Sequence, residues 1–181
     1  ILVICVIVCV FSVTKYHLRF NDSRKFNELE KVNLSKAVDG GQLSNQLNGL
    51  KWITYRYPNN PNEEINKLLK VKSILSSNES KKIIITDYQF LAPILNVHDN
   101  SPNQWHHPSV SFPLKGNQYF KDYKDFFVKS LKDNEIDFIF ETVEKNKTIT
   151  ELILDKECYS KSKMSDILVR IEINNKCDDL K

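Results

Sequence analysis

The first 13 residues, ILVICVIVCVFSV, constrain this chain more than any other segment, because they contain no charged side chain. As a helix, the run would be about 20 Å long, short of the roughly 30 Å hydrocarbon core of a bilayer. A secretory leader needs a basic segment before such a run and small residues after it, and the sequence shows neither. We therefore expect residues 1–18 to form the end of a transmembrane helix. A buried core element is the alternative, although the run offers no polar face.

Residues 19–35 follow as a polar connector. Basic side chains around this connector outnumber acidic ones, which favours the cytoplasmic side of a membrane under the positive-inside rule. The basic residues are Lys15, Arg19, Arg24, Lys25 and Lys31.

Residues 36–181 are expected to form one soluble globular domain. Over the whole chain, 41% hydrophobic and 27% charged residues are ordinary values for such a domain. The four glycines of the chain are too few for glycine-rich phosphate-binding loops. The formal net charge of +3 is spread along the sequence, so no nucleic acid is expected as a partner.

Helical and β-branched segments alternate along this domain. A helix signal begins at Pro61, where two glutamates follow in the first turn, and Ile83-Ile84-Ile85 is the clearest buried strand. The alternation predicts an α/β fold: a three-layer, mostly parallel sheet of about five strands with flanking helices. We expect helices at 42–47 (with Asp39 as its cap), 61–75, 88–95, 117–131 and 148–154, strands at 50–55, 83–86, 136–140 and 167–173, and a basic turn at 161–163. The buried stripe of the 117–131 helix is expected to comprise Tyr119, Phe120, Tyr123, Phe126, Phe127 and Leu131.

A candidate ligand site lies after the 83–86 strand, because open α/β sheets bind ligands beyond the carboxyl ends of their strands. A long loop, 96–116, follows and carries three of the four histidines. The candidate ligand contacts are Asp87, Tyr88, Gln89, His98, Asp99, Trp105, His106 and His107. They could hold a sugar or a phosphate headgroup, and the alternative is a loop with a structural role only. The histidine spacing matches no standard zinc pattern, so neither a metal nor a cofactor is expected.

The cysteines divide into two pairs. Cys5 and Cys9 lie in the apolar run and are interpreted as small hydrophobic residues. Cys158 and Cys177 each follow a predicted element and enclose 18 residues. If the enclosed strand folds back, they could form a disulfide that stabilises the fold by about 3 kcal/mol and indicates an oxidising space such as the periplasm. Two free thiols in a reducing compartment are the alternative.

Three segments carry a resemblance to a known family: AVDGGQLSNQLNGLKWIT, KIIITDYQFLAPIL and SFPLKGNQYFKDYKDFF. Over roughly residues 1–177, the chain resembles the C-terminal soluble region of bacterial polytopic membrane glycosyltransferases. These are GT-C type enzymes that use lipid-phosphate-linked sugars, related to dolichyl-phosphate-mannose mannosyltransferases and aminoarabinose transferases. The resemblance implies the bacterial inner membrane, with this domain on the periplasmic side. The family's catalytic acidic residues lie in loops of the membrane part, so no catalytic residue carries over to this chain.

Three hypotheses about function result. The first is an accessory extracytoplasmic domain of such a transferase, whose partners are the lipid bilayer, the upstream membrane domain of the same chain and a lipid-linked sugar or acceptor glycan. The second is a membrane-anchored α/β binding or interaction module without catalytic activity. The third is a small hydrolase that uses Asp87 and a loop histidine. The usual catalytic motifs, such as a serine elbow, a P-loop or H-E-x-x-H, do not occur in the sequence.

Overall fold

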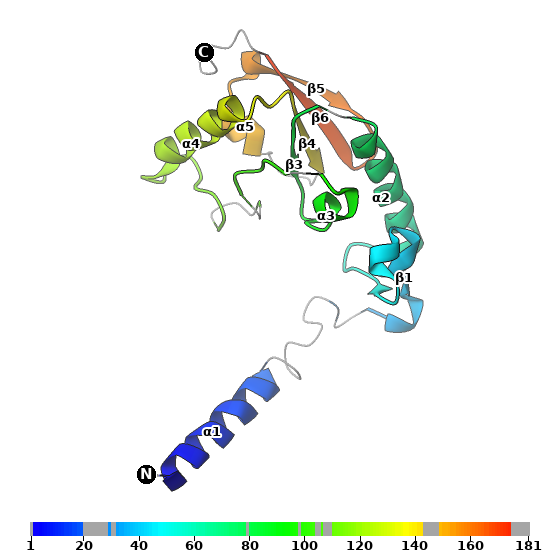
Figure 1. The fold of residues 1–181 in the computed structure, drawn as a ribbon, viewed down its shortest axis with the longest axis vertical. Coiled ribbons are helices and arrows are strands. Elements are labelled where there is room, and N and C mark those ends of the chain that lie inside the picture. The colour runs from blue at the N-terminus through cyan, green and yellow to red at the C-terminus, as the bar shows by residue number, and fades with distance from the viewer. Residues whose placement is uncertain are drawn as a thin grey trace. The chain divides into compact units, whose positions relative to one another are not determined.

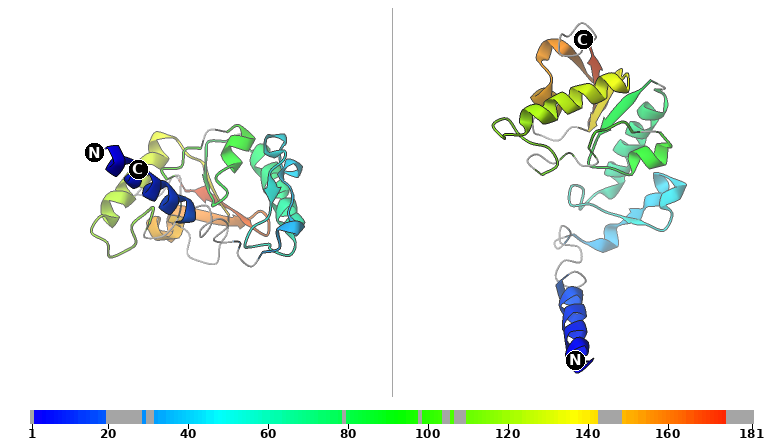
Figure 2. Two further views of the ribbon diagram at one scale, coloured as in Figure 1. Left: turned by 90° about the horizontal axis from the view of Figure 1, so that it is seen from below. Right: turned by 60° about the vertical axis from the view of Figure 1, so that its left-hand side comes forward.

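The computed structural model describes residues 2–19, 29, 32–78, 80–97, 99–103, 106, 110–142 and 149–174. The chain divides into two compact units, Ile1–Glu64 and Ile65–Lys181. The boundary between them falls within helix α2 (Pro61–Ser76). Figures 1 and 2 show the helices and strands of both units.

Helix α1 (Leu2–His17) contains the apolar run, and none of its side chains is buried (Figure 1). Its large apolar side chains are between 54% (Val6) and 79% (Leu2) exposed. Apolar residues lie all round this helix, which is typical of a segment in an apolar environment. Among the described residues, no helix has both the length and the hydropathy that a membrane span requires. The end of a transmembrane helix stays a prediction, and most of the connector 19–35 lies outside the described residues.

The rest of the first unit is built from short elements. Strands β1 (Val38–Asp39) and β2 (Lys51–Trp52) pair antiparallel. The 3-10 turns are η3 (Leu34–Lys36), η4 (Gly40–Gln42) and η5 (Asn45–Leu47). These turns replace the predicted helix at 42–47, and the predicted strand at 50–55 is reduced to two residues.

Asp39 explains why the chain turns tightly here. Its Oδ1 accepts hydrogen bonds from the backbone N–H of Gly41 at 2.7 Å and of Gly49 at 3.3 Å, so one carboxylate fixes both ends of the turn. Gly49 has a φ of +81°, a conformation that other residues rarely adopt. This position therefore favours glycine and a tight turn over a regular helix.

Glu64 is a fully buried carboxylate at the end of the first unit. Its Oε2 accepts hydrogen bonds from Nε1 of Trp52 at 2.8 Å and from Oγ1 of Thr54 at 2.9 Å. A buried carboxylate is tolerated only where donors satisfy it. Glu64 thus connects the first turn of α2 to the segment around β2.

The second unit contains a four-stranded sheet in the order β3-β4-β6-β5 (Figure 1). The strands are β3 (Lys82–Ile85), β4 (Phe138–Thr142), β5 (Tyr159–Lys163) and β6 (Leu168–Ile173). Strands β3 and β4 are parallel, while β6 is antiparallel to both β4 and β5. The prediction of a mixed α/β fold is confirmed.

The prediction of a mostly parallel sheet is wrong for the described strands, because only one of their three pairings in this sheet is parallel. The difference arises at β5, where the sequence predicts a basic turn at 161–163 and the residues YSKSK form a strand. An edge strand that faces water needs few apolar side chains, so it leaves a weak sequence signal. Four residues connect β5 to β6, and they form a hairpin instead of a parallel crossover.

Successive side chains of the strands belong to two apolar clusters, one on each face of the sheet. The helices of this unit besides α2 are α3 (Leu91–Leu95), α4 (Phe120–Asp133) and α5 (Ile149–Ile153), with the 3-10 turn η6 (Lys156–Cys158). Ile83 packs in a cluster with residues of α4 and α5. Ile84 and Phe140 pack in the other cluster, with residues of α2 and α3.

Helix α4 is amphipathic as predicted, but part of its predicted stripe faces outward. Phe127, Val128 and Leu131 are buried. Tyr119 is 62% exposed and Phe126 is 52% exposed. The buried stripe runs through Phe127, Val128 and Leu131, and Phe126 lies about 100° from Phe127 on the side away from Val128, at the edge of this stripe.

Candidate functional site

A polar cavity of about 500 Å³ lies at the carboxyl end of β3, where the sequence places the candidate site. This cavity, the β3 pocket, is lined by Ile84, Thr86, Gln89, Ala92, Pro93, Asp99, Ser101 and Asn103. Its volume falls within the roughly 300–1,000 Å³ that is typical of small-molecule sites. The strand, the segment into α3 and the following loop each contribute to its wall.

Thr86 builds one side of the β3 pocket on the sheet itself. It directly follows β3 and is buried. Its Oγ1 accepts hydrogen bonds from the backbone N–H of Tyr88 and from Oγ1 of Thr142, each at 3.0 Å. Thr142 is the last residue of β4, so these hydroxyls join the carboxyl ends of two parallel strands.

Asp99 attaches the loop to the outer edge of β3. Its Oδ1 accepts hydrogen bonds from the backbone N–H of Ile84 at 3.3 Å and of Ser101 at 3.0 Å. Among the described strands, β3 lies at the edge of the sheet, so none of them pairs with the N–H of Ile84 on that side. The Asp99 carboxylate takes the place of a strand partner and also forms part of the pocket wall.

A chain of hydrogen bonds continues from Ser101 through the loop. Oγ of Ser101 donates to the carbonyl oxygen of Asn103 at 2.8 Å and lies 3.1 Å from Nε2 of His106. Nδ2 of Asn103 donates to the carbonyl oxygen of Ser111 at 3.0 Å. These bonds fix the polar side chains of the pocket relative to the main chain.

His106 is uncharged at neutral pH. Burial lowers the pKa of His106 to about 4, because desolvation disfavours the imidazolium, and the negative charge of Asp87 partly opposes this effect. Nδ1 of His106 is buried and has no hydrogen-bond partner among the described residues. Among the described residues, the lining of the β3 pocket includes one carboxylate and no cation, and the neutral His106 adds no positive charge beside them.

The hydrolase hypothesis pairs Asp87 with a loop histidine, and His106 is the histidine of this loop that the structure describes. Its Nε2 lies 3.1 Å from Oγ of Ser101, and which of these two atoms donates depends on the tautomer of the ring. With a pKa of about 4, His106 is a weak base at neutral pH, which counts against a role as the general base.

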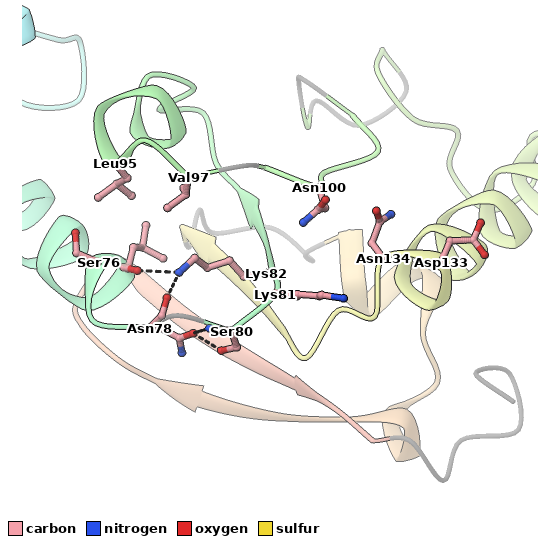
Figure 3. A pocket seen from close by; sticks show the side chains of 11 residues that line it. Ser76, Asn78, Ser80, Lys81, Lys82, Leu95, Val97, Asn100, Asp133 and Asn134 are labelled. Carbon is pink, nitrogen blue, oxygen red and sulfur yellow. Dashed lines mark hydrogen bonds between the residues drawn. The ribbon is translucent and has the colours of Figure 1, made fainter.

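A second cavity, of about 670 Å³, lies at the amino end of β3 (Figure 3). This lysine pocket is lined by Leu75, Ser76, Asn78, Ser80, Lys81, Lys82, Leu95, Val97, Asn100, Asp133 and Asn134. The buried Lys82 donates to the carbonyl oxygens of Leu75, at 2.9 Å, and of Asn78. Lys81 points the opposite way in Figure 3 and forms an exposed ion pair with Glu135. A cation at the carboxyl end of α2 stabilises that helix end, so we assign Lys82 a structural role.

The structure brings part of the predicted site together. Gln89 and Asp99 line the β3 pocket. His106 contacts Ser101 of the pocket wall, while Asp87 is exposed and influences the pKa of His106.

Tyr88 lies elsewhere: it packs against the cluster of α2 and α3, with the ring of Phe90 edge-on at 5.9 Å. The remaining candidates, His98, Trp105 and His107, lie outside the described residues. Within the described part of the chain, no group of three or more His, Cys, Asp or Glu residues is placed to hold a metal ion.

Thr86, Ser101 and Asn103 also line the pocket, although they are not among the residues predicted from the sequence. Serine, threonine and asparagine are common in loops because they hydrogen-bond to nearby main chain, so their type gives no signal of a site. The position of Thr86 directly after a buried strand is a signal that could have included it.

Cys158 is buried and disulfide-bonded. Strand β5 begins at the next residue and pairs antiparallel with β6, and the N–H of Asn174 donates to the carbonyl oxygen of Cys158 at 2.8 Å. The chain therefore folds back beside Cys158, which is the condition under which the proposed disulfide could form. Cys177 lies outside the described residues, and its pairing with Cys158 stays a prediction.

Comparison with known proteins gives no match: no family model, no curated protein and no solved structure matches this chain. Its function is therefore inferred from its own residues.

Proposed function

We propose that this chain is a membrane-anchored α/β domain that binds a small polar ligand in the β3 pocket and performs no covalent chemistry itself. The observation that carries the proposal is the way the pocket is held in place. Asp99, Ser101 and Asn103 line the cavity, and each makes a hydrogen bond to the main chain. Polar groups that are already fixed favour recognition, because a ligand then orders few side chains on binding.

Helix α1 supports the membrane part of the proposal. Exposed apolar surface costs roughly 25 cal/mol per Å² in water, and a continuous apolar helix surface marks an interaction site. The apolar side chains of α1 are exposed on every side of the helix. A lipid bilayer is the environment that removes all of this surface from water, so the bilayer is the proposed partner of α1.

A more specific form of the proposal is an accessory extracytoplasmic domain of a GT-C type glycosyltransferase that uses a lipid-phosphate-linked sugar. It rests on the resemblance of the three segments, and it places the domain on the periplasmic side of a bacterial inner membrane as a three-layer α/β domain. Catalysis would then belong to an upstream membrane part of the same chain. The disulfide bond of Cys158 supports an oxidising compartment, whereas the basic residues around the connector favour the cytoplasmic side.

Flotation with lipid vesicles tests the membrane anchor. The full chain should float with the vesicles, and the double variant Val6→Lys, Val10→Lys should stay at the bottom of the gradient. The matched control is Asn48→Lys with Ser160→Lys, which adds the same charge at exposed positions outside α1. If the α1 variant floats as the wild type does, the anchoring proposal is wrong.

Two further measurements test the other parts. The proposal states that the chain performs no covalent chemistry. It would be contradicted if the full chain hydrolyses p-nitrophenyl esters or glycosides and the Ser101→Ala variant does not. For the transferase form, the coding sequence upstream of Ile1 should encode further apolar spans and an acidic extracytoplasmic loop. An initiation codon just before Ile1 would refute that form and leave the binding module.

A further inference from the structure

We propose that strand β5 is a docking edge, which adds an extended acidic segment of a partner protein to the sheet as a further antiparallel strand. The strand order β3-β4-β6-β5 places β5 at one border of the described sheet (Figure 1). The β3 pocket belongs to the strand at the other border. The inference therefore goes beyond the proposed function and does not depend on ligand binding in that pocket.

The first argument is the direction of the backbone groups of β5. Two hydrogen bonds fix the register of the β5–β6 hairpin at its ends. The N–H of Asn174 donates to the carbonyl oxygen of Cys158 at 2.8 Å, and the N–H of Met164 donates to that of Leu168 at 2.9 Å. In an antiparallel pair, residues bonded across to the neighbouring strand alternate with residues whose N–H and C=O point away from it. The even-numbered residues of β5 are therefore bonded to β6, and the outward-pointing ones are Tyr159, Lys161 and Lys163.

The second argument is that this edge is open in the described part of the chain. No backbone hydrogen bond joins the three outward-pointing residues to another described segment. The border at β3 differs, because the Asp99 carboxylate accepts a hydrogen bond from the N–H of Ile84 there. Proteins usually protect an edge strand with a proline, a bulge, a covering segment or charged side chains. Among the described residues, β5 shows only the last of these, because it has no proline and pairs with β6 over five successive positions without a bulge.

The third argument is charge. Alternate side chains lie on the same face of a strand, so Lys161 and Lys163 share one face of β5. Lys161 forms an ion pair with Glu151. Lys163 is exposed and forms no ion pair with another described residue. Side chains directly opposite each other on antiparallel strands interact, and opposite charges there stabilise the pairing. An added strand with acidic residues opposite the two lysines is therefore complementary to β5.

The same rule disfavours a second copy of this chain as the occupant. Two β5 strands that pair antiparallel about their middle residue place Lys161 opposite Lys161. Like charges in this position destabilise a sheet. Tyr159 indicates the other requirement for a partner strand, because it is partly buried and packs against the apolar cluster of α4 and α5. An apolar residue opposite Tyr159 would extend that cluster, so the partner strand carries two alternate acidic residues followed by an apolar one.

Hydrogen exchange of the isotopically labelled full chain in detergent tests the open edge. In the free chain, the amides of Lys161 and Lys163 should exchange fast, whereas those of Ser160 and Ser162, which are bonded to β6, should be protected. The probe is a capped seven-residue peptide in which threonines alternate with glutamate, glutamate and valine. Its addition should shift the amide signals of Lys161 and Lys163 and slow their exchange.

Modified peptides separate strand addition from charge attraction alone. N-methylation of the two glutamates and the valine blocks the N–H groups that would face β5, and it should abolish binding. The matched control is N-methylation of three threonines, which blocks N–H groups on the other side of the peptide and should preserve binding. A peptide with lysine in place of glutamate should bind about tenfold more weakly at low salt, with a smaller difference at high salt.

Lys163→Glu tests the charge on the chain itself. The variant should bind the glutamate peptide about fivefold more weakly than wild type does, and it should bind the lysine peptide more tightly. Lys70→Glu is the matched control, because Lys70 is exposed on α2 and its replacement changes the net charge by the same amount. This control should keep the wild-type preference for the glutamate peptide.

Three outcomes would overturn the inference. Protected amides at Lys161 and Lys163 in the free chain would show that the edge is already occupied. Equal binding of the two kinds of N-methylated peptide would show that backbone hydrogen bonds do not hold the peptide. Equal binding of the glutamate and lysine peptides, or binding of neither, would refute an acidic partner strand.

Discussion

Acid should destabilise the second unit through His106. The ordinary pKa of a histidine is 6.5, and burial lowers the pKa of His106 to about 4 in the folded chain. Above pH 6.5 both the folded and the unfolded chain hold a neutral imidazole, so His106 contributes no pH dependence there. Below pH 6.5, His106 becomes protonated in the unfolded chain but stays neutral in the folded chain. Protonation therefore stabilises the unfolded state, and the free energy of unfolding decreases. The decrease is about 2 kcal/mol at pH 5 and is complete, at about 3 kcal/mol, below pH 4.

Urea unfolding of wild type and His106→Gln at pH 7, 6 and 5 measures this effect. Glutamine does not titrate, so the difference between the two pH profiles isolates His106 from all carboxylates that titrate in the same range. Wild type should lose about 2 kcal/mol more than the variant between pH 7 and pH 5. The control is Asn48→Gln, which exchanges one exposed amide side chain for another and should keep the wild-type profile.

Asp87→Asn checks the cause of the pKa. Because the charge of Asp87 raises the pKa of His106, its removal should move the imidazole titration to a still lower pH. The titration is followed directly from the imidazole signals by nuclear magnetic resonance. An imidazole that titrates near pH 6.5, or parallel pH profiles for wild type and His106→Gln, would refute this reasoning.

Three further predictions concern stability and association. Glu64→Ala removes the buried acceptor of the Trp52 and Thr54 hydrogen bonds and should lower the free energy of unfolding by about 2–4 kcal/mol. Glu64→Gln keeps an acceptor oxygen and should lower it by about half as much. Urea unfolding measures both losses, and equal losses would contradict this prediction. If the disulfide of Cys158 closes the 18-residue loop to Cys177, its reduction should lower the free energy of unfolding by about 3 kcal/mol. Peptide mapping without reductant should then find these two cysteines linked and not another pair. Lys163→Ile removes a charge from the edge strand β5, so the variant should self-associate more than wild type in the same detergent. Its free energy of unfolding should change by less than about 0.5 kcal/mol. An unchanged sedimentation profile would count against this prediction.

The parts of the fold that sequence analysis found carry strong local signals. Pro61 and the two glutamates after it start α2 as predicted, and the run Ile83-Ile84-Ile85 is a strand with both faces buried. Such signals arise because helix starts and fully buried strands each restrict the residue types they accept. The edge strand β5 has no such restriction, and its polar sequence resembles a turn.

Where a cavity lies follows from a rule about strand ends, whereas which side chains line it does not, and that this cavity binds a ligand stays a prediction. The rule for carboxyl strand ends places the site after β3, and the cavity lies there. Which side chains line it depends on how the loop folds, and this is decided by hydrogen bonds between residues that are common in any loop. The sequence predicts Asp99 as a ligand contact. In the structure, its Oδ1 accepts hydrogen bonds from two backbone N–H groups of the chain itself.

The bond between Ile84 and Asp99 makes one amide of the sheet a reporter of the loop. Its hydrogen is held by the loop and not by a neighbouring strand, so it exchanges with deuterium whenever the loop lifts from the edge. Amides that are bonded between β3 and β4 exchange only when the sheet opens. The exchange rate at this single position therefore measures how often the Asp99 carboxylate leaves the edge of β3 in the unmodified protein.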